Sequence, residues 1–116
     1  MNVLLDENLD HALRMLLGRH EVVTVTYMGW SGLQNGELLR AAEDRGVDVL
    51  LTGDQSLHQE QNLLGRRLAI VALSAIQLPL IKEHLPEVIA AIDRAVPGSF
   101  QAVDCGTFKR KKPAEE

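Results

Sequence analysis

The stretch Val47-Asp48-Val49-Leu50-Leu51-Thr52-Gly53-Asp54 decides the fold, because an apolar run of strand length ends in polar residues and a glycine. A second run, Val3-Leu4-Leu5, ends in a similar way at Asp6-Glu7-Asn8. Short apolar runs with polar boundaries are typical of buried strands. Buried strands that alternate with helical segments predict a parallel sheet, whose carboxyl ends open into one ligand-binding crevice. The two runs therefore predict that Asp6 and Asp54 lie at one edge of a sheet.

Outward from these runs, the sequence predicts alternating strands and helices. Strands are expected at about residues 2–5, 22–25, 47–52, 68–73 and 99–103. One helix is expected after the cap Asp10, a second at 36–45 after the cap Asn35, and a third at 76–95 with an offset near Pro86. Residues 55–64 are expected to form a loop or a short helix. This order predicts a three-layer α/β/α sandwich with a mainly parallel five-stranded sheet. We expect the strand order 2-1-3-4-5, which makes the first and third strands neighbours. One domain is expected over residues 1–108, followed by a charged tail over 109–116.

Composition and charge restrict the class of protein. The chain has 116 residues, 46% of them hydrophobic, which is ordinary for one globular domain. Its 12 basic and 16 acidic residues give a net charge of -4, which excludes a broad basic face for nucleic acid but not a nuclease with acidic metal ligands. Cys105 is the only cysteine, and neither a signal peptide nor a membrane-spanning run is apparent. We therefore expect a protein of the reducing cytoplasm that does not bind a membrane.

The acidic residues predict a metal site. Two carboxylates at one edge of a sheet repel each other unless a cation lies between them. Asp6 or Asp54 alone is more often a turn former or a helix cap, but their occurrence at two strand ends favours metal binding. Glu37 lies in the first turn of the second helix, where it either compensates the helix dipole or serves as a third ligand. An all-carboxylate set favours a hard cation, Mg²⁺ or Mn²⁺.

Other site chemistries lack their sequence patterns. The four histidines have no zinc-ligand spacing, and the chain contains neither a glycine-rich phosphate loop nor a Gly-x-Ser-x-Gly nucleophile motif. A phosphotransfer receiver domain also gathers acids on such a sheet, but the lysine that it requires at the edge is missing after the fourth and fifth strands. Glu43, Asp44 and Glu60 are expected to be solvated charges.

Three segments carry a resemblance to a known family. "LLDENL" at residues 4–9, "NGELLRAA" at 35–42 and "DVLLTGDQSL" at 48–57 resemble the DUF5615 branch of the PIN-like proteins. These are compact relatives of the PIN-domain ribonucleases, and many are toxins of bacterial toxin–antitoxin pairs. The resemblance covers nearly the whole chain and implies a PIN-like fold, metal-dependent cleavage of RNA and a cognate antitoxin. Carried over by position, Asp6, Glu37 and Asp54 match the acidic catalytic and metal-binding residues.

Two positions depart from the pattern of the family. Asn35 stands where many relatives have Asp, and Ser56-Leu57 replaces the second Asp and the Phe of Thr-x-Asp-x-Asp-Phe. The site is therefore expected either to hold one metal instead of two or to be weakened. The alternative function is a non-catalytic PIN-like interaction module with a degenerate acidic site.

Polar residues near the acids are candidates for RNA binding. The expected substrate-binding residues are Asn8, Asn35, Gln55, Ser56, Gln59 and Arg66, although a polar run of this kind is also typical of a solvated helix. Trp30 either stacks a base or packs as a lid on the core or at a dimer contact. The basic run at residues 109–112 would bind RNA or an acidic partner, and a homodimer is a further expectation.

Overall fold

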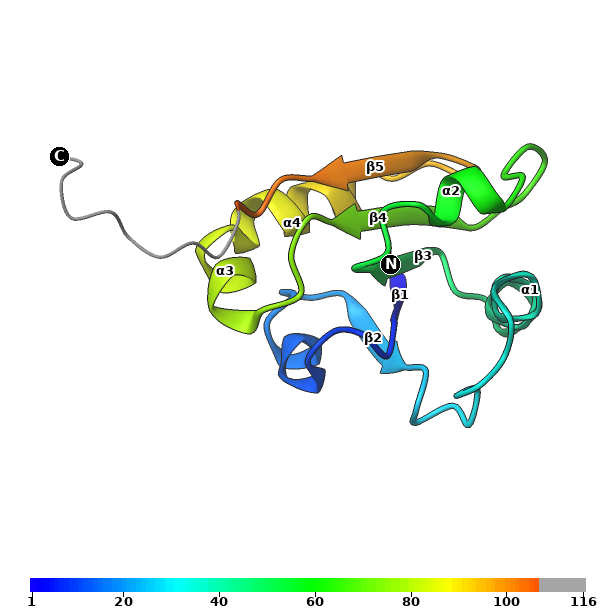
Figure 1. The fold of residues 1–116 in the computed structure, drawn as a ribbon, viewed down its shortest axis with the longest axis horizontal. Helices are drawn as coiled ribbons and strands as arrows, with labels where there is room; N and C mark the ends of the chain where they lie inside the picture. The colour runs from blue at the N-terminus through cyan, green and yellow to red at the C-terminus, as the bar shows by residue number, and fades with distance from the viewer. Residues whose placement is uncertain (107–116) are drawn as a thin grey trace, which may run out of the picture.

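The computed structural model describes residues 1–106 as an α/β fold (Figure 1). Its elements, in chain order, are β1 (Asn2–Leu5), the 3-10 helix η1 (His11–Met15), β2 (Glu21–Thr24), α1 (Asn35–Arg45), β3 (Val49–Thr52), α2 (Leu57–Glu60), β4 (Ala69–Leu73), α3 (Leu78–Glu83), α4 (Leu85–Asp93) and β5 (Phe100–Val103). The predicted tail at residues 109–116 lies outside the described residues.

The five strands form one sheet in the order β2-β1-β3-β4-β5, which confirms the predicted order. Every neighbouring pair is parallel, so the predicted sheet is confirmed as well. Before each new strand the chain crosses back to the amino-terminal ends of the strands, because parallel strands need a crossover connection. The first crossover moves from β1 to β2 and the second moves back past β1 to β3, so the order reverses there. This reversal is the switch point at which ligands bind in such sheets.

Both faces of the sheet are covered by apolar packing. Val3, Leu5, Val49 and Leu51 face a core that contains residues of η1, α3 and α4. The residues between them, Leu4 and Leu50, face a second core that contains Leu38, Leu39 and Ala42 of α1. Figure 1 shows α1 on one side of the central strands and η1 with α3 on the other. Burial on both faces explains why the central strands are continuous apolar runs and do not alternate.

The helices differ from the prediction in three places. The helix expected at residues 76–95 with an offset near Pro86 is instead two helices: α3 ends at Glu83 and α4 begins at Leu85. Pro86 lies in the first turn of α4, where a missing N–H costs no hydrogen bond. The segment after Asp10 is a 3-10 helix, although Asp10 caps it as predicted by accepting a 2.8 Å hydrogen bond from Ala12 N. α1 begins one residue early, with Gln34 as its cap, and ends at Gly46, whose φ of 89° is left-handed.

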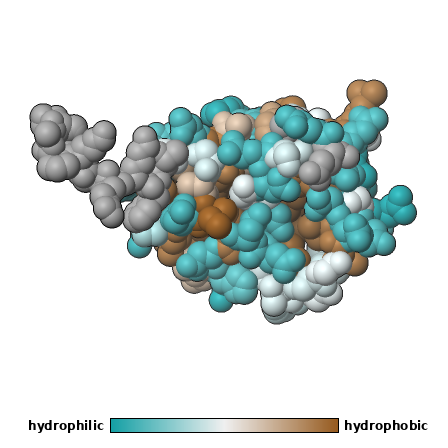
Figure 2. Space-filling view, viewed as in Figure 1, coloured by the Kyte–Doolittle hydropathy of each residue, from teal (hydrophilic) through white to brown (hydrophobic). Residues whose placement is uncertain are grey.

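The surface combines polar and apolar residues. Figure 2 shows hydrophilic side chains over much of the visible face, with hydrophobic residues between them. In the described part of the chain, no helix is both long and apolar enough to cross a membrane.

Candidate functional site

The carboxyl ends of β1 and β3 place the two predicted acids at the same edge of the sheet. Leu5 pairs with Leu51, and the N–H of Asp6 continues the ladder by donating to the Leu51 carbonyl at 2.9 Å. Thr52 is completely buried, and its Oγ1 donates to Asp6 Oδ2 at 2.7 Å. The same Oγ1 accepts a 3.0 Å hydrogen bond from the N–H of Asp54. The hydroxyl of Thr52 therefore connects Asp6 to the start of the Asp54 loop.

Sequence reasoning missed Thr52. The signal that could have found it is the position itself, because a buried hydroxyl at the last residue of a strand needs hydrogen-bond partners. Both strands adjacent to β3 continue into loops at this edge, and the Asp6 carboxylate supplies the partner.

Each carboxylate also stabilises its own loop. Asp54 Oδ1 accepts hydrogen bonds from the Ser56 N–H at 2.9 Å and the Ser56 hydroxyl at 2.8 Å, which forms an Asx turn before α2. Asp6 Oδ1 accepts a 2.8 Å hydrogen bond from the Glu7 N–H. The turn-forming roles expected of single Asp residues are thus present. Hydrogen bonds to Asp54 involve Oδ1, and each carboxylate oxygen has two lone pairs, so both acids keep acceptor capacity.

Gly53 lies between Thr52 and Asp54 in a closely packed loop. Its N–H donates to the Asn8 side-chain oxygen at 3.1 Å, which joins the loops that follow β3 and β1. A Cβ at this position would collide with the side chain of Ile76, from the segment after β4. Glycine is therefore required here by close approach, and Asn8 has a structural contact in addition to its predicted role in RNA binding.

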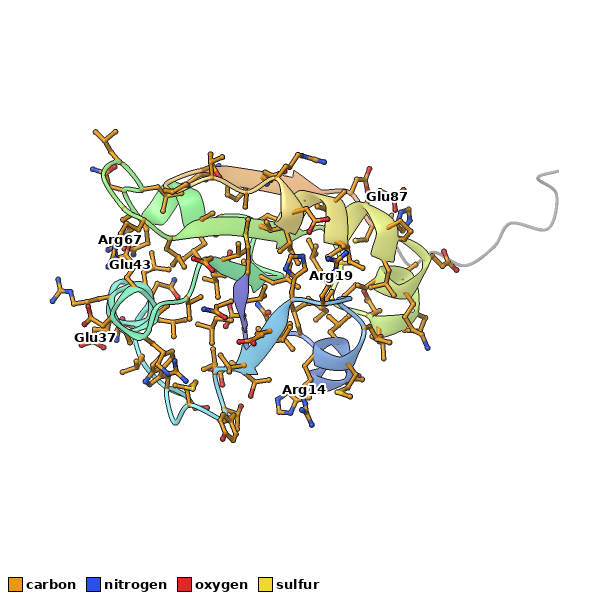
Figure 3. All side chains as sticks on the ribbon, turned by 180° about the vertical axis from the view of Figure 1, so that it is seen from behind. Arg14, Arg19, Glu37, Glu43, Arg67 and Glu87 are labelled. Carbon is orange, nitrogen blue, oxygen red and sulfur yellow. The ribbon has the colours of Figure 1, made fainter. Side chains whose placement is uncertain are left out.

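Glu37 is exposed at the first turn of α1, and its Oε1 accepts a 3.2 Å hydrogen bond from the Gln34 N–H (Figure 3). This contact belongs to helix capping, one of the two readings of the sequence. The side chains of His58 and Glu60, the latter expected to be a solvated charge, lie outside the described part of the structure. Among the other residues of 1–106, no three His, Cys, Asp or Glu side chains are grouped closely enough to hold a metal ion. The structure therefore brings Asp6 and Asp54 to one edge but does not group Glu37 with them.

The remaining candidates divide between two ends of the sheet. Asn35 is the first residue of α1, and Gln61, just after α2, lies against the neighbouring Gly36. Ser56 caps α2; Gln55 before the helix and Gln59 within it are both exposed. Arg66 lies apart from them, because it precedes β4 and its Nη1 donates to Glu43 Oε1 at 2.7 Å.

The expectation that Glu43 is a solvated charge is wrong. Its side chain is only 14% exposed, and its Oε2 accepts hydrogen bonds from the N–H groups of Arg67 and Leu68 at 3.0 and 3.2 Å. Burial raises the pKa of the Glu43 carboxyl, but the Leu68 and Arg67 N–H groups and the Arg66 guanidinium outweigh it, so the pKa is lowered. Glu43 thus fixes the chain before β4 to α1, and Figure 3 shows Glu43 and Arg67 side by side. Helical periodicity does not predict the burial of Glu43, because this burial results from a tertiary contact.

Trp30 is partly buried and packs against the core on the α1 side of the sheet. This placement agrees with the lid reading of Trp30 and leaves base stacking without support from the packing.

Comparisons with known proteins found no similar protein. No family model matches the chain, and no match was found among curated proteins or solved structures. The functional conclusion therefore depends on the geometry of the site and on the motifs of the sequence.

Proposed function

We propose that this protein is a metal-dependent ribonuclease of the cytoplasm, with a PIN-like three-layer α/β/α fold, and the toxin of a bacterial toxin–antitoxin pair. The observation that carries the proposal is the Thr52 hydroxyl, which connects Asp6 with the Asp54 loop at the switch point of the sheet. Ligands of such sheets bind at this point. The resemblance of the three sequence segments to the DUF5615 branch supplies the reaction class and the antitoxin partner.

The residues present fit a magnesium or manganese ion. Mg²⁺ usually keeps several waters and binds one or two carboxylates together with substrate phosphates, so two acids on the protein are sufficient. Asp6 and Asp54 both retain acceptor capacity after their loop hydrogen bonds. When bound, the ion would polarise a phosphate oxygen and lower the pKa of the attacking water. Glu37 would act through water, because its carboxylate caps α1.

The chain itself positions these groups. Thr52 fixes the orientation of the Asp6 carboxylate, and the Asx turn at Ser56 fixes that of Asp54. Asn8 accepts a hydrogen bond from the N–H of Gly53, which joins the two acidic loops. The exposed polar side chains of Gln55, before α2, and Gln59, within it, would hydrogen-bond the sugars or phosphates of RNA.

Cleavage of single-stranded RNA tests this function. Purified chain, free of any antitoxin, should cleave with Mn²⁺ or Mg²⁺ and stop with EDTA. The Asp54→Asn variant keeps the side-chain oxygen that accepts from Ser56, so it should fold normally. Its cleavage rate should fall more than about 100-fold, because even partners outside the metal ligands cost about 10–100-fold when lost. Asp44→Asn, an exposed acid on α1, is the matched control and should cleave normally.

The alternative is a non-catalytic PIN-like interaction module, which is favoured by the capping bond of Glu37 and by Ser56 in place of an acid. Thermal unfolding with Mn²⁺ separates the two functions. A metal that binds only the folded chain stabilises it by about 2.7 kcal/mol at about 100-fold excess over Kd. A nuclease should show this stabilisation and lose it in Asp54→Asn. A chain that binds RNA, never cleaves it and shows no response to Mn²⁺ would be the interaction module.

A further inference from the structure

β2 is an edge strand whose outer side is open. Within residues 1–106, β2 pairs with β1 on one side and with no strand on the other. The N–H groups of Glu21 and Val25 donate to the Met1 and Leu5 carbonyls of the β1 side, both at 3.1 Å. Because consecutive residues direct their backbone groups to opposite edges, Val22 and Thr24 direct theirs outward.

The outward groups are only partly satisfied. The Thr24 carbonyl accepts a hydrogen bond from the Met28 N–H at 3.0 Å, within the turn that follows β2. The N–H and C=O of Val22 and the N–H of Thr24 therefore have no backbone partner among the described residues; Thr24 is only 5% exposed, so the accessible part of the free edge is centred on Val22. Such a row of unpaired groups is a template for an added strand.

A cavity of about 480 Å³ lies along this edge. It is lined by Val22, Val23 and Thr24 of β2, His11 and Arg14 of η1, and Thr26 and Tyr27 of the following turn. Tyr27 is 81% exposed, so one large aromatic residue of the lining is open to solvent. An added strand would therefore lie in this cavity, between β2, η1 and the turn that follows β2.

Arg14 gives this cavity a positive charge. Arg14 and His11 are both exposed, and the described lining residues include no carboxylate. The Asp10 carboxylate, which caps η1 by accepting from the Ala12 N–H, does not line the cavity. Figure 3 shows Arg14 on the outer side of η1. The polar partners offered to an occupant are thus the backbone edge of β2 on one wall and the side chains of Arg14 and His11 on the other.

We propose that this edge binds an acidic segment of another protein in an extended conformation, by adding a strand to β2. The backbone of that segment would pair with Val22 and Thr24, and its carboxylates would face Arg14 and His11. Main-chain hydrogen bonds would provide affinity, and the Arg14 guanidinium would select acidic sequences. This surface does not depend on the acidic edge at Asp6 and Asp54.

A second copy of the chain fits this edge less well. Pairing of β2 with β2 of another copy about a two-fold axis would keep the same face of both sheets on the same side. The Arg14 side chains of the two copies would then lie on one face and repel each other. The Glu21 side chain could not offset them, because it alternates with Val22 and lies on the α1 face of the sheet.

A peptide titration followed by ¹H–¹⁵N NMR tests the proposal. The probe is the capped peptide Thr-Glu-Val-Glu-Thr, with the Lys-for-Glu peptide and an N-methylated acidic peptide as comparisons. The acidic peptide should shift the amide signals of Val22 and Thr24 and bind at least about fivefold more tightly than the lysine peptide. N-methylation should abolish the shifts, because it removes the backbone donors.

Charge-reversal variants locate the contact. Arg14→Glu should weaken binding of the acidic peptide about fivefold, since an exposed attraction becomes a repulsion. Arg40→Glu makes the same charge change on α1 and should alter binding less than twofold. Equal binding of the acidic and lysine peptides, or shifts confined to another face, would overturn the proposal. Dimerisation of the chain alone, with protected β2 amides, would instead assign the edge to a second copy.

Discussion

Replacing Glu43 by Gln should destabilise the fold by about 2 kcal/mol. The carboxylate serves Arg66 with one oxygen and the Arg67 and Leu68 N–H groups with the other, whereas Gln offers a single acceptor oxygen. Hydrogen bonds to charged groups contribute about 1.5–3 kcal/mol, and an unsatisfied buried donor costs about 1–3 kcal/mol. Arg66 already has a buried Nε without a partner. The side chains of Glu43 and Arg66 are 14% and 22% exposed, so water offsets part of the loss.

Urea unfolding measures this loss. With a slope of about 2 kcal/mol per molar urea, the midpoint of Glu43→Gln should fall by about 1 M. The pH dependence adds a second test. The folded pKa of Glu43 lies below its ordinary value of 4.5, so the unfolded chain binds more protons in acid. The stabilisation is therefore complete above pH 4.5 and is lost as the pH falls through the lower folded pKa.

The difference in the free energy of unfolding between wild type and Glu43→Gln should accordingly become smaller in acid. Asp44→Asn is the matched control, because it makes the same chemical change at the next residue of α1, where the side chain is exposed. Its free energy of unfolding should change by less than about 0.5 kcal/mol. An equal loss in both variants, or a difference that does not depend on pH, would refute the role of Glu43 as a fixed contact.

Two further predictions concern packing. Burial, together with neighbouring carboxylates, raises the pKa of the Cys105 thiol, so a disulfide reagent at pH 8 should label the folded chain at least about 100-fold more slowly than the chain in urea. Gly53→Ala should lower the free energy of unfolding in urea by about 1–3 kcal/mol, because the new Cβ collides with the Ile76 side chain. Adding Ile76→Ala should recover most of this loss. Gly36→Ala is the control: its Cβ would make an ordinary contact, so the free energy of unfolding should not fall.

The strands and their order could be predicted from the sequence because each rests on a local signal. Strands buried on both faces require continuous apolar runs such as Leu4-Leu5 and Leu50-Leu51, and polar residues or glycines follow them. The right-handed crossover rule then leaves few orders, and the pair Asp6 and Asp54 selects one of them. The common edge of these two acids follows directly from the order of the strands.

The missed features depend on contacts or choices that are not local. The Glu43 contact forms only when residues 66–68 approach α1 from a distant part of the sequence. The break at His84 is ambiguous in the sequence, because Pro86 is compatible with both a kink and a new first turn. Thr52 became part of the site only when the structure showed which hydroxyl lies between the two loops.

Turn formation and metal binding are compatible at this edge because they use different atoms. The Asx turn uses Asp54 Oδ1, and an Asn side chain carries an equivalent oxygen. What Asn lacks is the negative charge and the second oxygen that a cation requires. Asp54→Asn therefore separates the two roles: a residue that only forms the turn would tolerate the change in every assay. Loss of cleavage and of the response to Mn²⁺ without loss of stability would identify Asp54 as a metal ligand, whereas an unchanged variant would leave it as a turn former.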